Sequence, residues 1–349
     1  MVRVNAEWVE EYFNLLLPAD PKQLGIDEAQ QLKLAHLPTS LFRYRPFPPM
    51  HGSAVPEGPD SESLRQRVLK EIRTGEVCLS SPATFNDPYD SVFCFLNQPD
   101  LDLAGHPKLP TMLEEAGIAE FLCPEEIRQV LQSQKPLHTL GHLLARKDPS
   151  IPEHDVDRFL AFLEEQTSGV MKKAQEDMGS RMREGVRICC FSATVQSAAM
   201  WSHYASAHSG VCIEYDFNAL PRNHPLRYAV CPVAYVDALF DAGQYFAQAQ
   251  AGQFNNMWLT LACLHKSAEW SYEQEWRIVL PLGPGQPPRG WATLPIKAVH
   301  LGARAPMSTA QVVRRVTRSV GVPLFQTSLA KASFSFSTQP FAREDELHR

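Results

Sequence analysis

The chain has 349 residues, a formal net charge of -6, 44% hydrophobic residues and 21% charged residues. This length allows a large core, and the composition is typical of a globular protein rather than a disordered or fibrous one. The acidic balance argues against a general nucleic-acid binder, because such proteins usually carry a basic surplus. We find no secretory signal and no stretch near the roughly 20 apolar residues of a membrane-spanning helix. We therefore expect a cytoplasmic protein without a membrane partner.

The N-terminal part predicts a helix and then a short strand. Residues 5–17 carry apolar side chains at helical spacing and end at Pro18. Residues 40–47, SLFRYRPF, are typical of a strand with Arg43 and Arg45 on one face. An exposed strand face is one explanation for these arginines. A phosphate clamp is the other, because the planar guanidinium group matches phosphate geometry.

A helix, a strand and an acidic turn follow. Residues 61–75 predict a helix with Ser61 as its N-cap and Gly75 just after its end. Residues 76–81 predict a strand. The stretch FNDPYD at 85–90 predicts a turn, because Asn and Asp before Pro favour turn geometry.

The middle of the chain changes from helix to strand. Residues 100–185 contain charged helical segments broken by Pro-containing turns, and they predict a helical insertion. Residues 186–194, VRICCFSAT, resume a strand pattern that places Ser192 and Thr194 on one face. Residues 211–217 alternate between apolar and polar side chains and predict a further strand.

Residues 197–210, SAAMWSHYASAHSG, predict a short helix that ends at Gly210 and is crowded by Trp201, His203, Tyr204 and His208. Packing on one helical face is the commoner explanation for either histidine alone. A metal site is less favoured, because H-x4-H is near the wrong register and a third ligand is not evident. Asp87 and Asp90 in the preceding turn also lack a third oxygen ligand, so we expect no bound metal.

Residues 265–280, HKSAEWSYEQEWRIVL, place Glu273 and Glu275 two positions apart before an apolar run. If that run is a strand, both carboxylates share one face. A solvated strand edge is the commoner explanation for an isolated E-x-E. The run looks buried, however, and a buried charge is costly unless a cation pairs with it. Aromatic surfaces that suit a flat ligand are supplied by Trp270, Tyr272 and Trp276.

Four separated motifs occur in order: LFRYRP, FNDPYD, CFS…MWSHYASAHSGVCIEYD and K…W-x-YEQEWRIV…IKAVHLG. Together they resemble an uncharacterised bacterial family, known only as a domain of unknown function. The resemblance covers most of the chain apart from the N-terminal helix and the helical insertion. By itself it implies no activity.

A second resemblance implies a chemistry. An early strand arginine, a strand of the form F-S-x-T and a late E-x-E are similar to the Arg-Ser-Glu layout of ADP-ribosyltransferases. This resemblance implies an α+β fold, a split β-sandwich around a cleft for NAD, the co-substrate. Glu275 would be the catalytic glutamate, and Glu273 would assist the acceptor. The predicted NAD contacts are Arg43, Arg45, Ser192, Thr194, Trp201, His203 and Tyr204.

The sequence departs from that family in three respects. Ala193 stands between Ser192 and Thr194 in place of the usual S-T-S order. A long insertion precedes the serine strand, and a long stretch separates Ser192 from Glu275. The cluster of His203 and Tyr204 has no counterpart in the family pattern.

We divide the chain into an N-terminal helical segment at 1–38, a catalytic-like α+β domain formed by 39–99 and 186–349, and a helical insertion at 100–185. The function expected is transfer of ADP-ribose from NAD to a protein or nucleic acid, in conflict with phage or rival cells.

Two alternatives stay open. One is a non-catalytic nucleotide-sensing or interaction module. The other is a metal-dependent nuclease or hydrolase built on Asp87, Asp90 and His203. The enzyme hypothesis requires an early arginine, Ser192 and Glu275 to meet in one pocket.

Overall fold

The computed structural model describes residues 5–18, 23–48, 60–95, 109–133, 135–148, 150, 152–243, 257–283, 285–287 and 289–341. Helices and strands are both present, and the main sheet contains antiparallel pairs and one parallel pair. The α+β class is therefore confirmed. The predicted boundary between residues 99 and 100 lies outside the described residues.

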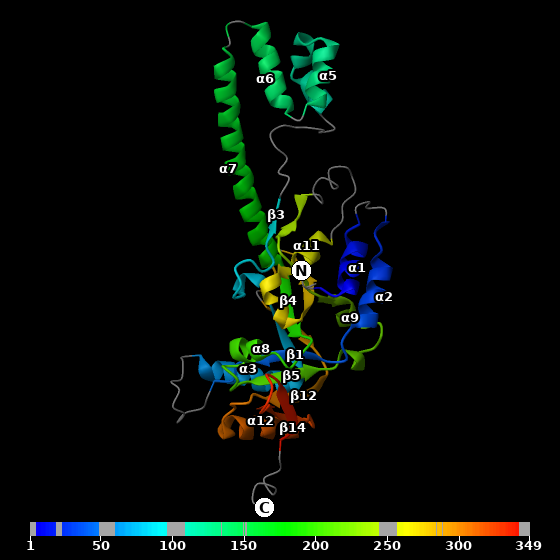
Figure 1. Ribbon diagram of the computed structural model, residues 1–349, viewed down its shortest axis with the longest axis vertical. Coiled ribbons are helices and arrows are strands. Elements are labelled where there is room, and N and C mark those ends of the chain that lie inside the picture. The colour runs from blue at the N-terminus through cyan, green and yellow to red at the C-terminus, as the bar shows by residue number, and fades with distance from the viewer. Residues whose placement is uncertain are drawn as a thin grey trace, which may run out of the picture. The chain divides into compact units, whose positions relative to one another are not determined.

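The chain divides into two compact units. The larger unit comprises residues 1–92, 181–240 and 255–349, and the smaller comprises residues 93–180 and 241–254. The smaller unit contains α4 (Leu109–Glu115), η3 (Ile118–Phe121), α5 (Pro124–Gln132), α6 (Pro136–Lys147) and most of α7 (Glu153–Gly185). Its apolar core is built from Leu109, Leu113, Leu122, Val130, Leu140 and Leu143. Helices α5 and α6 pack against each other in this unit (Figure 1).

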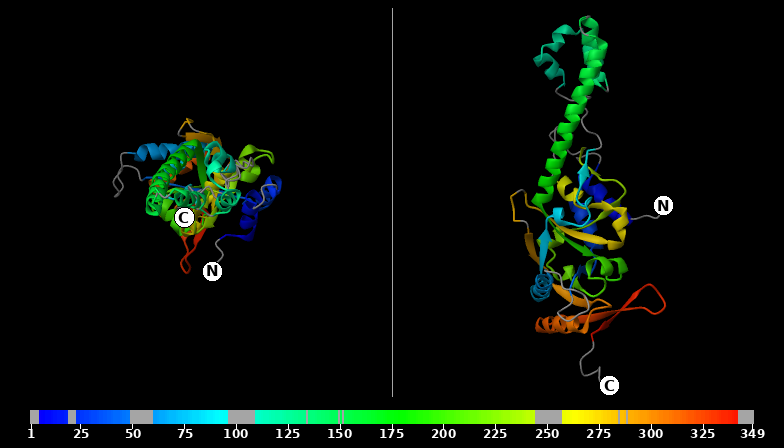
Figure 2. Two further views of the ribbon diagram at one scale, coloured as in Figure 1. Left: turned by 90° about the horizontal axis from the view of Figure 1, so that it is seen from above. Right: turned by 90° about the vertical axis from the view of Figure 1, so that its left-hand side faces the viewer.

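A ten-stranded sheet forms the centre of the larger unit. Its strands are β1 (Leu41–Arg45), β2 (Glu76–Ser80), β4 (Val186–Ser192), β5 (Val211–Tyr215), β6 (Val230–Pro232), β10 (Glu275–Pro281), β11 (Arg289–Thr293), β12 (Ile296–Leu301), β13 (Leu324–Leu329) and β14 (Phe336–Pro340). The main path runs β11-β2-β4-β1-β5-β12-β13-β14, and β10 pairs with β4 and β6. Figure 2 shows the red hairpin of β13 and β14 beside the orange helix α12 (Met307–Ser319).

The larger unit also contains helices and a smaller pair of strands. Its remaining helices are α1 (Glu7–Leu16), α2 (Ile26–His36), α3 (Ser61–Thr74), η2 (Pro82–Thr84), α8 (Ala198–Tyr204), η4 (Phe217–Ala219), α9 (Pro225–Ala229), α11 (Trp258–Ala262) and η5 (Ala268–Glu273). Strands β7 (Ala234–Val236) and β9 (His265–Ser267) form a separate parallel pair. The strands β3 (Phe93–Cys94) and β8 (Phe240–Asp241) complete the described elements.

The two faces of the sheet are covered by different helices. One face, the α3 face, packs Leu41, Phe191 and Ile278 against Val68 and Ile72 of α3. The opposite face, the α8 face, packs Tyr44 and Cys212 against Met200 and Trp201 of α8. Helix α8 lies beside β1 (Figure 1). Alternate residues of each strand therefore enter different environments.

The helix predicted at 197–210 ends earlier, at Tyr204. The residues Ser206, Ala207 and His208 have φ values of 48°, 51° and 71°, in the left-handed region that cannot continue a right-handed helix. The carbonyl oxygen of His208 accepts a hydrogen bond of 2.9 Å from the amide of Arg304. A Cβ atom at Gly302 would overlap that carbonyl oxygen. Glycine is therefore needed at position 302, where the backbone contacts the left-handed turn at His208.

We expect Gly302→Ala to lower the free energy of unfolding by about 1–3 kcal/mol, because the left-handed turn would have to shift. The matched control is Gly290→Ala on β11, where the nearest heavy atoms to a new Cβ lie 3.8 Å away. Urea unfolding of both variants provides the measurement. Equal losses at the two positions would contradict the close approach at Gly302.

Candidate functional site

The two glutamates of the E-x-E motif do not lie on one strand. Glu273 is the last residue of η5, and β10 begins at Glu275. Between them Gln274 has a φ of 46°, in the left-handed region. The prediction of a shared strand face was therefore wrong in its geometry. The two carboxylates nevertheless converge, because the left-handed residue turns Glu273 back toward the side chain of Lys266.

Lys266 on β9 bridges the two carboxylates. Its Nζ atom donates hydrogen bonds of 2.5 Å to Glu273 Oε2 and 2.9 Å to Glu275 Oε2. The same Nζ lies 5.0 Å from the ring centroid of Trp270. All three charged side chains are buried. Lys266 is thus the cation that the sequence pattern of two buried acids required.

Arg277 on β10 joins the pair to a third carboxylate. Its Nε donates a 2.8 Å hydrogen bond to Glu275 Oε1, and its Nη1 donates one of 2.8 Å to Asp90 Oδ1. Its Nη2 bonds to Asp90 Oδ2 at 2.5 Å and to Glu275 Oε2 at 3.0 Å. Arg277 is fully buried, and its Nη1 also donates a 2.6 Å hydrogen bond to the carbonyl oxygen of Cys263. We call these five residues, Asp90, Lys266, Glu273, Glu275 and Arg277, the acid cluster.

The acid cluster contains three carboxylates and two cations, so it carries an excess negative charge when all five groups are ionised. Burial alone would raise the pKa of Glu275, but Arg277 and Lys266 outweigh it and hold that pKa well below the usual range. Burial and the charge of Glu275 raise the pKa of Glu273, against the opposing effect of Lys266. Two neighbouring carboxylates are thus driven to opposite protonation preferences.

Aromatic side chains surround the outer side of Glu273. The hydroxyl of Tyr204 donates a 2.7 Å hydrogen bond to Glu273 Oε1, and Asn86 Nδ2 lies 3.4 Å from that hydroxyl. The ring of Tyr272 lies 6.3 Å from that of His203 and 6.0 Å from that of Trp270. We call His203, Tyr204, Trp270 and Tyr272 the aromatic wall. His203 is exposed, and Tyr204, Trp270 and Tyr272 are partly exposed, so solvent reaches this side of the cluster.

Ser192 is close to the acid cluster, as the sequence hypothesis requires. It pairs in register with Glu275, and its Oγ donates a 2.6 Å hydrogen bond to the carbonyl oxygen of Glu273. The amide of Thr194 donates to Ser192 Oγ at 3.2 Å. Ser192 is fully buried and holds the backbone of the acidic segment. Trp201 is also fully buried, and its indole donates to the carbonyl oxygen of Val195, so it belongs to the core.

Arg43 and Arg45 do not meet the acid cluster. Phe42 pairs in register with Ser192, so Phe42 shares the α8 face with Ser192 and Glu275. The two arginines alternate with Phe42 and project from the α3 face. Arg43 Nη1 there donates a 2.9 Å hydrogen bond to Glu71 Oε1. The expectation of a single pocket containing an early arginine, Ser192 and Glu275 is therefore wrong, because alternate residues of β1 lie on opposite faces of the sheet.

The residues proposed for a metal site also fail to converge. Asp90 binds Arg277, whereas Asp87 Oδ1 accepts a 2.9 Å hydrogen bond from the amide of Tyr89. Across the described part of the chain, no group of three or more His, Cys, Asp or Glu side chains is arranged to hold a metal ion. This geometry gives no support to the hydrolase alternative.

Sequence reasoning missed Lys266, Arg277 and Asn86 as members of this site. Lys266 and Arg277 stand in the same quoted stretch as the two glutamates, and a search for the cations that buried acids require would have found them. Asn86 and Asp90 come from the predicted turn at 85–90. Their meeting with β10 depends on long-range pairing that spacing does not show.

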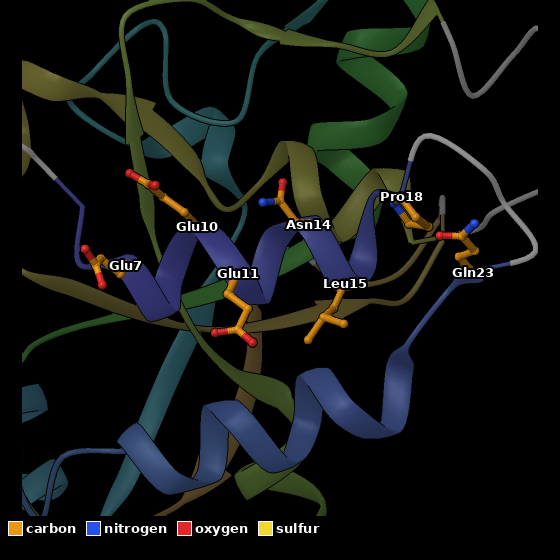
Figure 3. Close-up of a pocket in the computed structure, with 7 residues that line it drawn as sticks. All are labelled: Glu7, Glu10, Glu11, Asn14, Leu15, Pro18 and Gln23. Carbon is orange, nitrogen blue, oxygen red and sulfur yellow. The ribbon is translucent and has the colours of Figure 1, made fainter.

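The larger unit has two hollows away from the acid cluster. One, of about 580 Å³, lies along α1 and is lined by Glu7, Glu10, Glu11, Asn14, Leu15, Pro18 and Gln23 (Figure 3). The other, of about 460 Å³, lies between the end of α3 and the end of α12. Neither is lined by a residue of the acid cluster.

The fold and the site together define an α+β protein with a buried, carboxylate-rich cluster beside an aromatic wall. Residues 200–278 match a family described as Protein of unknown function (DUF2971). This match confirms the expectation of an uncharacterised family for residues 200–278, which include Tyr204, Lys266, Glu273, Glu275 and Arg277. The predicted motifs LFRYRP and FNDPYD lie outside it. No curated protein and no solved structure matches the chain. Within the described residues, no helix has the length and apolarity needed to cross a bilayer.

The opposite pKa shifts predict opposite pH responses of two variants. The ordinary glutamate pKa is 4.5. With its lowered folded pKa, Glu275 contributes stability that is complete above about pH 4.5 and is lost as the pH falls. With its raised folded pKa, Glu273 contributes stability that is complete below about pH 4.5 and is lost as the pH rises.

Relative to the original protein, the unfolding free energy of Glu275→Gln should therefore fall as the pH rises from about 2 to about 4.5 and then stay level. That of Glu273→Gln should rise as the pH increases above about 4.5. Urea titrations from about pH 2 to pH 8 measure both differences. Changes of the same sign would show that the two carboxylates do not differ in this way.

Proposed function

We propose that this protein is an NAD-dependent ADP-ribosyltransferase-like enzyme whose acting carboxylate is Glu273. The observation that carries the proposal is the contrast between two neighbouring glutamates, one held ionised and one with a raised pKa. Environments that push two carboxylates apart in this manner are typical of acid–base pairs in enzymes. The proposed fold is a relative of the split β-sandwich, and the proposed acceptor is a protein or a nucleic acid.

The charge of the cluster supports NAD as the ligand. The nicotinamide ring of NAD is a flat cation, and the acid cluster has more carboxylates than cations. Aromatic faces attract cations, particularly where water is excluded. Trp270 and Tyr272 are partly exposed beside Glu273, so a flat cation placed there would contact both ring surfaces and negative charge.

The chemistry of transfer suits two carboxylates with different roles. The bond between the nicotinamide nitrogen and the ribose carbon breaks, its electron pair stays on nicotinamide, and positive charge develops on the ribose. An ionised Glu275 supplies fixed negative charge that favours this transition state. An acceptor atom then bonds to the ribose carbon and gives up its proton, and Glu273 is suited to take that proton.

The sequence hypothesis made Glu275 the catalytic glutamate and Glu273 the residue that assists the acceptor. The hydrogen bonds of the two side chains support the opposite assignment. Both glutamates are buried, but the oxygens of Glu275 accept hydrogen bonds only from the cations Arg277 and Lys266, whereas one oxygen of Glu273 is bonded to the neutral hydroxyl of Tyr204. Glu273 is held by Tyr204 on the side where the aromatic wall is partly exposed. The acting carboxylate is therefore proposed to be Glu273, with Glu275 as a fixed charge and Ser192 as a positioning residue. The early arginine that the sequence hypothesis required is absent from this site, because Arg43 and Arg45 bind Glu71 on the other face. The proposal therefore no longer rests on the Arg-Ser-Glu layout and stands on the two glutamates and the aromatic wall alone.

A non-catalytic nucleotide-sensing module is the second candidate. One observation favours it: all four carboxylate oxygens of Glu273 and Glu275 already have donors within the protein. A hydrogen-bond network in which every polar atom has a partner makes its surroundings rigid. Such a network can form one side of a binding site without taking part in a reaction.

We expect Glu273→Gln to lower the transfer of ADP-ribose from NAD to the acceptor by about 10²- to 10⁴-fold, because the variant cannot take the proton that the acceptor gives up. Labelled NAD, incubated with the protein and a cell lysate, measures both release and transfer. The matched control is Glu269→Gln, an exposed glutamate on the same turn, which should behave as the original protein. Unchanged transfer in the Glu273 variant would remove the proposed role.

The two candidates differ in one simple measurement. A sensor should show a higher melting temperature in the presence of NAD without release of nicotinamide, because a ligand that binds the folded state stabilises it. An enzyme should release nicotinamide under the same conditions. The absence of both stabilisation and release would contradict both candidates.

A further inference from the structure

Arg43 and Arg45 lie on the opposite face of the sheet from the acid cluster and form a separate cluster on the α3 face. Glu71 of α3 is its only carboxylate among the described residues. Glu71 Oε1 accepts hydrogen bonds from Arg43 Nη1 at 2.9 Å and from the hydroxyl of Tyr215 at 2.7 Å. Glu71 Oε2 lies 3.1 Å from Arg45 Nε. One buried carboxylate thus faces two guanidinium groups.

This arrangement leaves a surplus of positive charge at a largely buried position. Burial alone would raise the pKa of Glu71, but Arg43 and Arg45 outweigh it and lower that pKa, so the carboxylate is ionised at neutral pH. One guanidinium charge nevertheless remains without a counter-charge in this group. Buried charge is costly when it is unpaired, and an anion would offset that cost.

Arg45 is the arginine with donors to spare. Its Nε faces Glu71 but is not aligned to donate a hydrogen bond. No described residue accepts a hydrogen bond from its two terminal amino groups. The side chain retains 20% of its exposure, against 5% for Glu71, so solvent reaches Arg45 past the carboxylate. Arg43 is 15% exposed, and its Nη2 makes only a long contact of 3.4 Å to the carbonyl oxygen of Cys78.

From these contacts we infer that Arg43 and Arg45 form a binding site for a phosphoryl group, on the sheet face opposite the acid cluster. A guanidinium fork donates two parallel hydrogen bonds to a tetrahedral oxyanion, which a lysine cannot do. Glu71 and Tyr215 hold the two arginines in place, and the outer donors of Arg45 bind the ligand. The site differs in charge, face and ligand from the proposed NAD site and does not depend on it.

Calorimetric titration of the full chain with inorganic phosphate, pyrophosphate and adenosine monophosphate tests the site, each at matched ionic strength. We expect Arg45→Gln to weaken phosphate binding at least tenfold. The matched control, Arg73→Gln, removes the same charge from an exposed position at the end of α3 and should bind as the original protein does. Failure of the original protein to bind any of the three ligands, or equal weakening in both variants, would overturn the proposal.

Two further variants make the result decisive. Arg45→Lys keeps the charge but loses the fork, so it should also bind phosphate more weakly, and it carries the test if Arg45→Gln does not fold. Unchanged affinity in the lysine variant would overturn the bidentate site. Glu273→Gln should keep phosphate affinity, because it lies on the other face. Loss of phosphate binding in that variant would instead assign the ligand to the acid cluster and overturn the separate site.

Discussion

The larger unit depends on the neutralisation of charge inside it. Arg277 lies at the centre of β10 with no exposed surface, and a guanidinium group in that position is tolerable only when acceptors surround it. Asp90, Glu275 and the carbonyl oxygen of Cys263 supply those acceptors. Because Asp90 comes from an early turn and Lys266 from β9, the same requirement fixes distant segments against β10. Loss of either cation would leave three buried carboxylates with a single positive charge.

The alternation of side chains along each strand then determines which charged groups lie on each face of the sheet. Register pairing places Ser192 and Glu275 on the α8 face, and the alternation of β1 places Arg43 and Arg45 on the α3 face. One cluster consequently has an excess of carboxylates and the other an excess of guanidinium groups. A shift of β1 by a single residue would exchange its two faces, so the formation of both clusters depends on the register of β1 with β4 and β5.

Local patterns predicted much of the fold and only part of the site. The helix expected at 61–75 is α3, and Gly75 has the left-handed φ of 68° expected just after its end. Its N-cap is Asp60, however, and not Ser61 as predicted. The strands expected near 186–194 and 211–217 are β4 and β5, each slightly shorter. The convergence of Glu273 and Glu275 was also predicted, but through the wrong local structure. Spacing alone gives no sign that Gln274 is left-handed, nor that β1 meets β4 through Phe42 rather than through an arginine.

Left-handed backbone conformations flank the hydrogen bonds of the acid cluster. Gln274 is left-handed immediately after Glu273, and three successive left-handed residues begin two positions after Tyr204, the hydrogen-bond donor to Glu273. Ser91, next to Asp90, is left-handed as well. Such conformations cost about 1–3 kcal/mol per residue and persist only where surrounding contacts enforce them. The buried hydrogen bonds of Glu273 to Lys266 and of Asp90 to Arg277 supply contacts of that kind, so the acid cluster that neutralises the buried charges also holds the strained segments beside it.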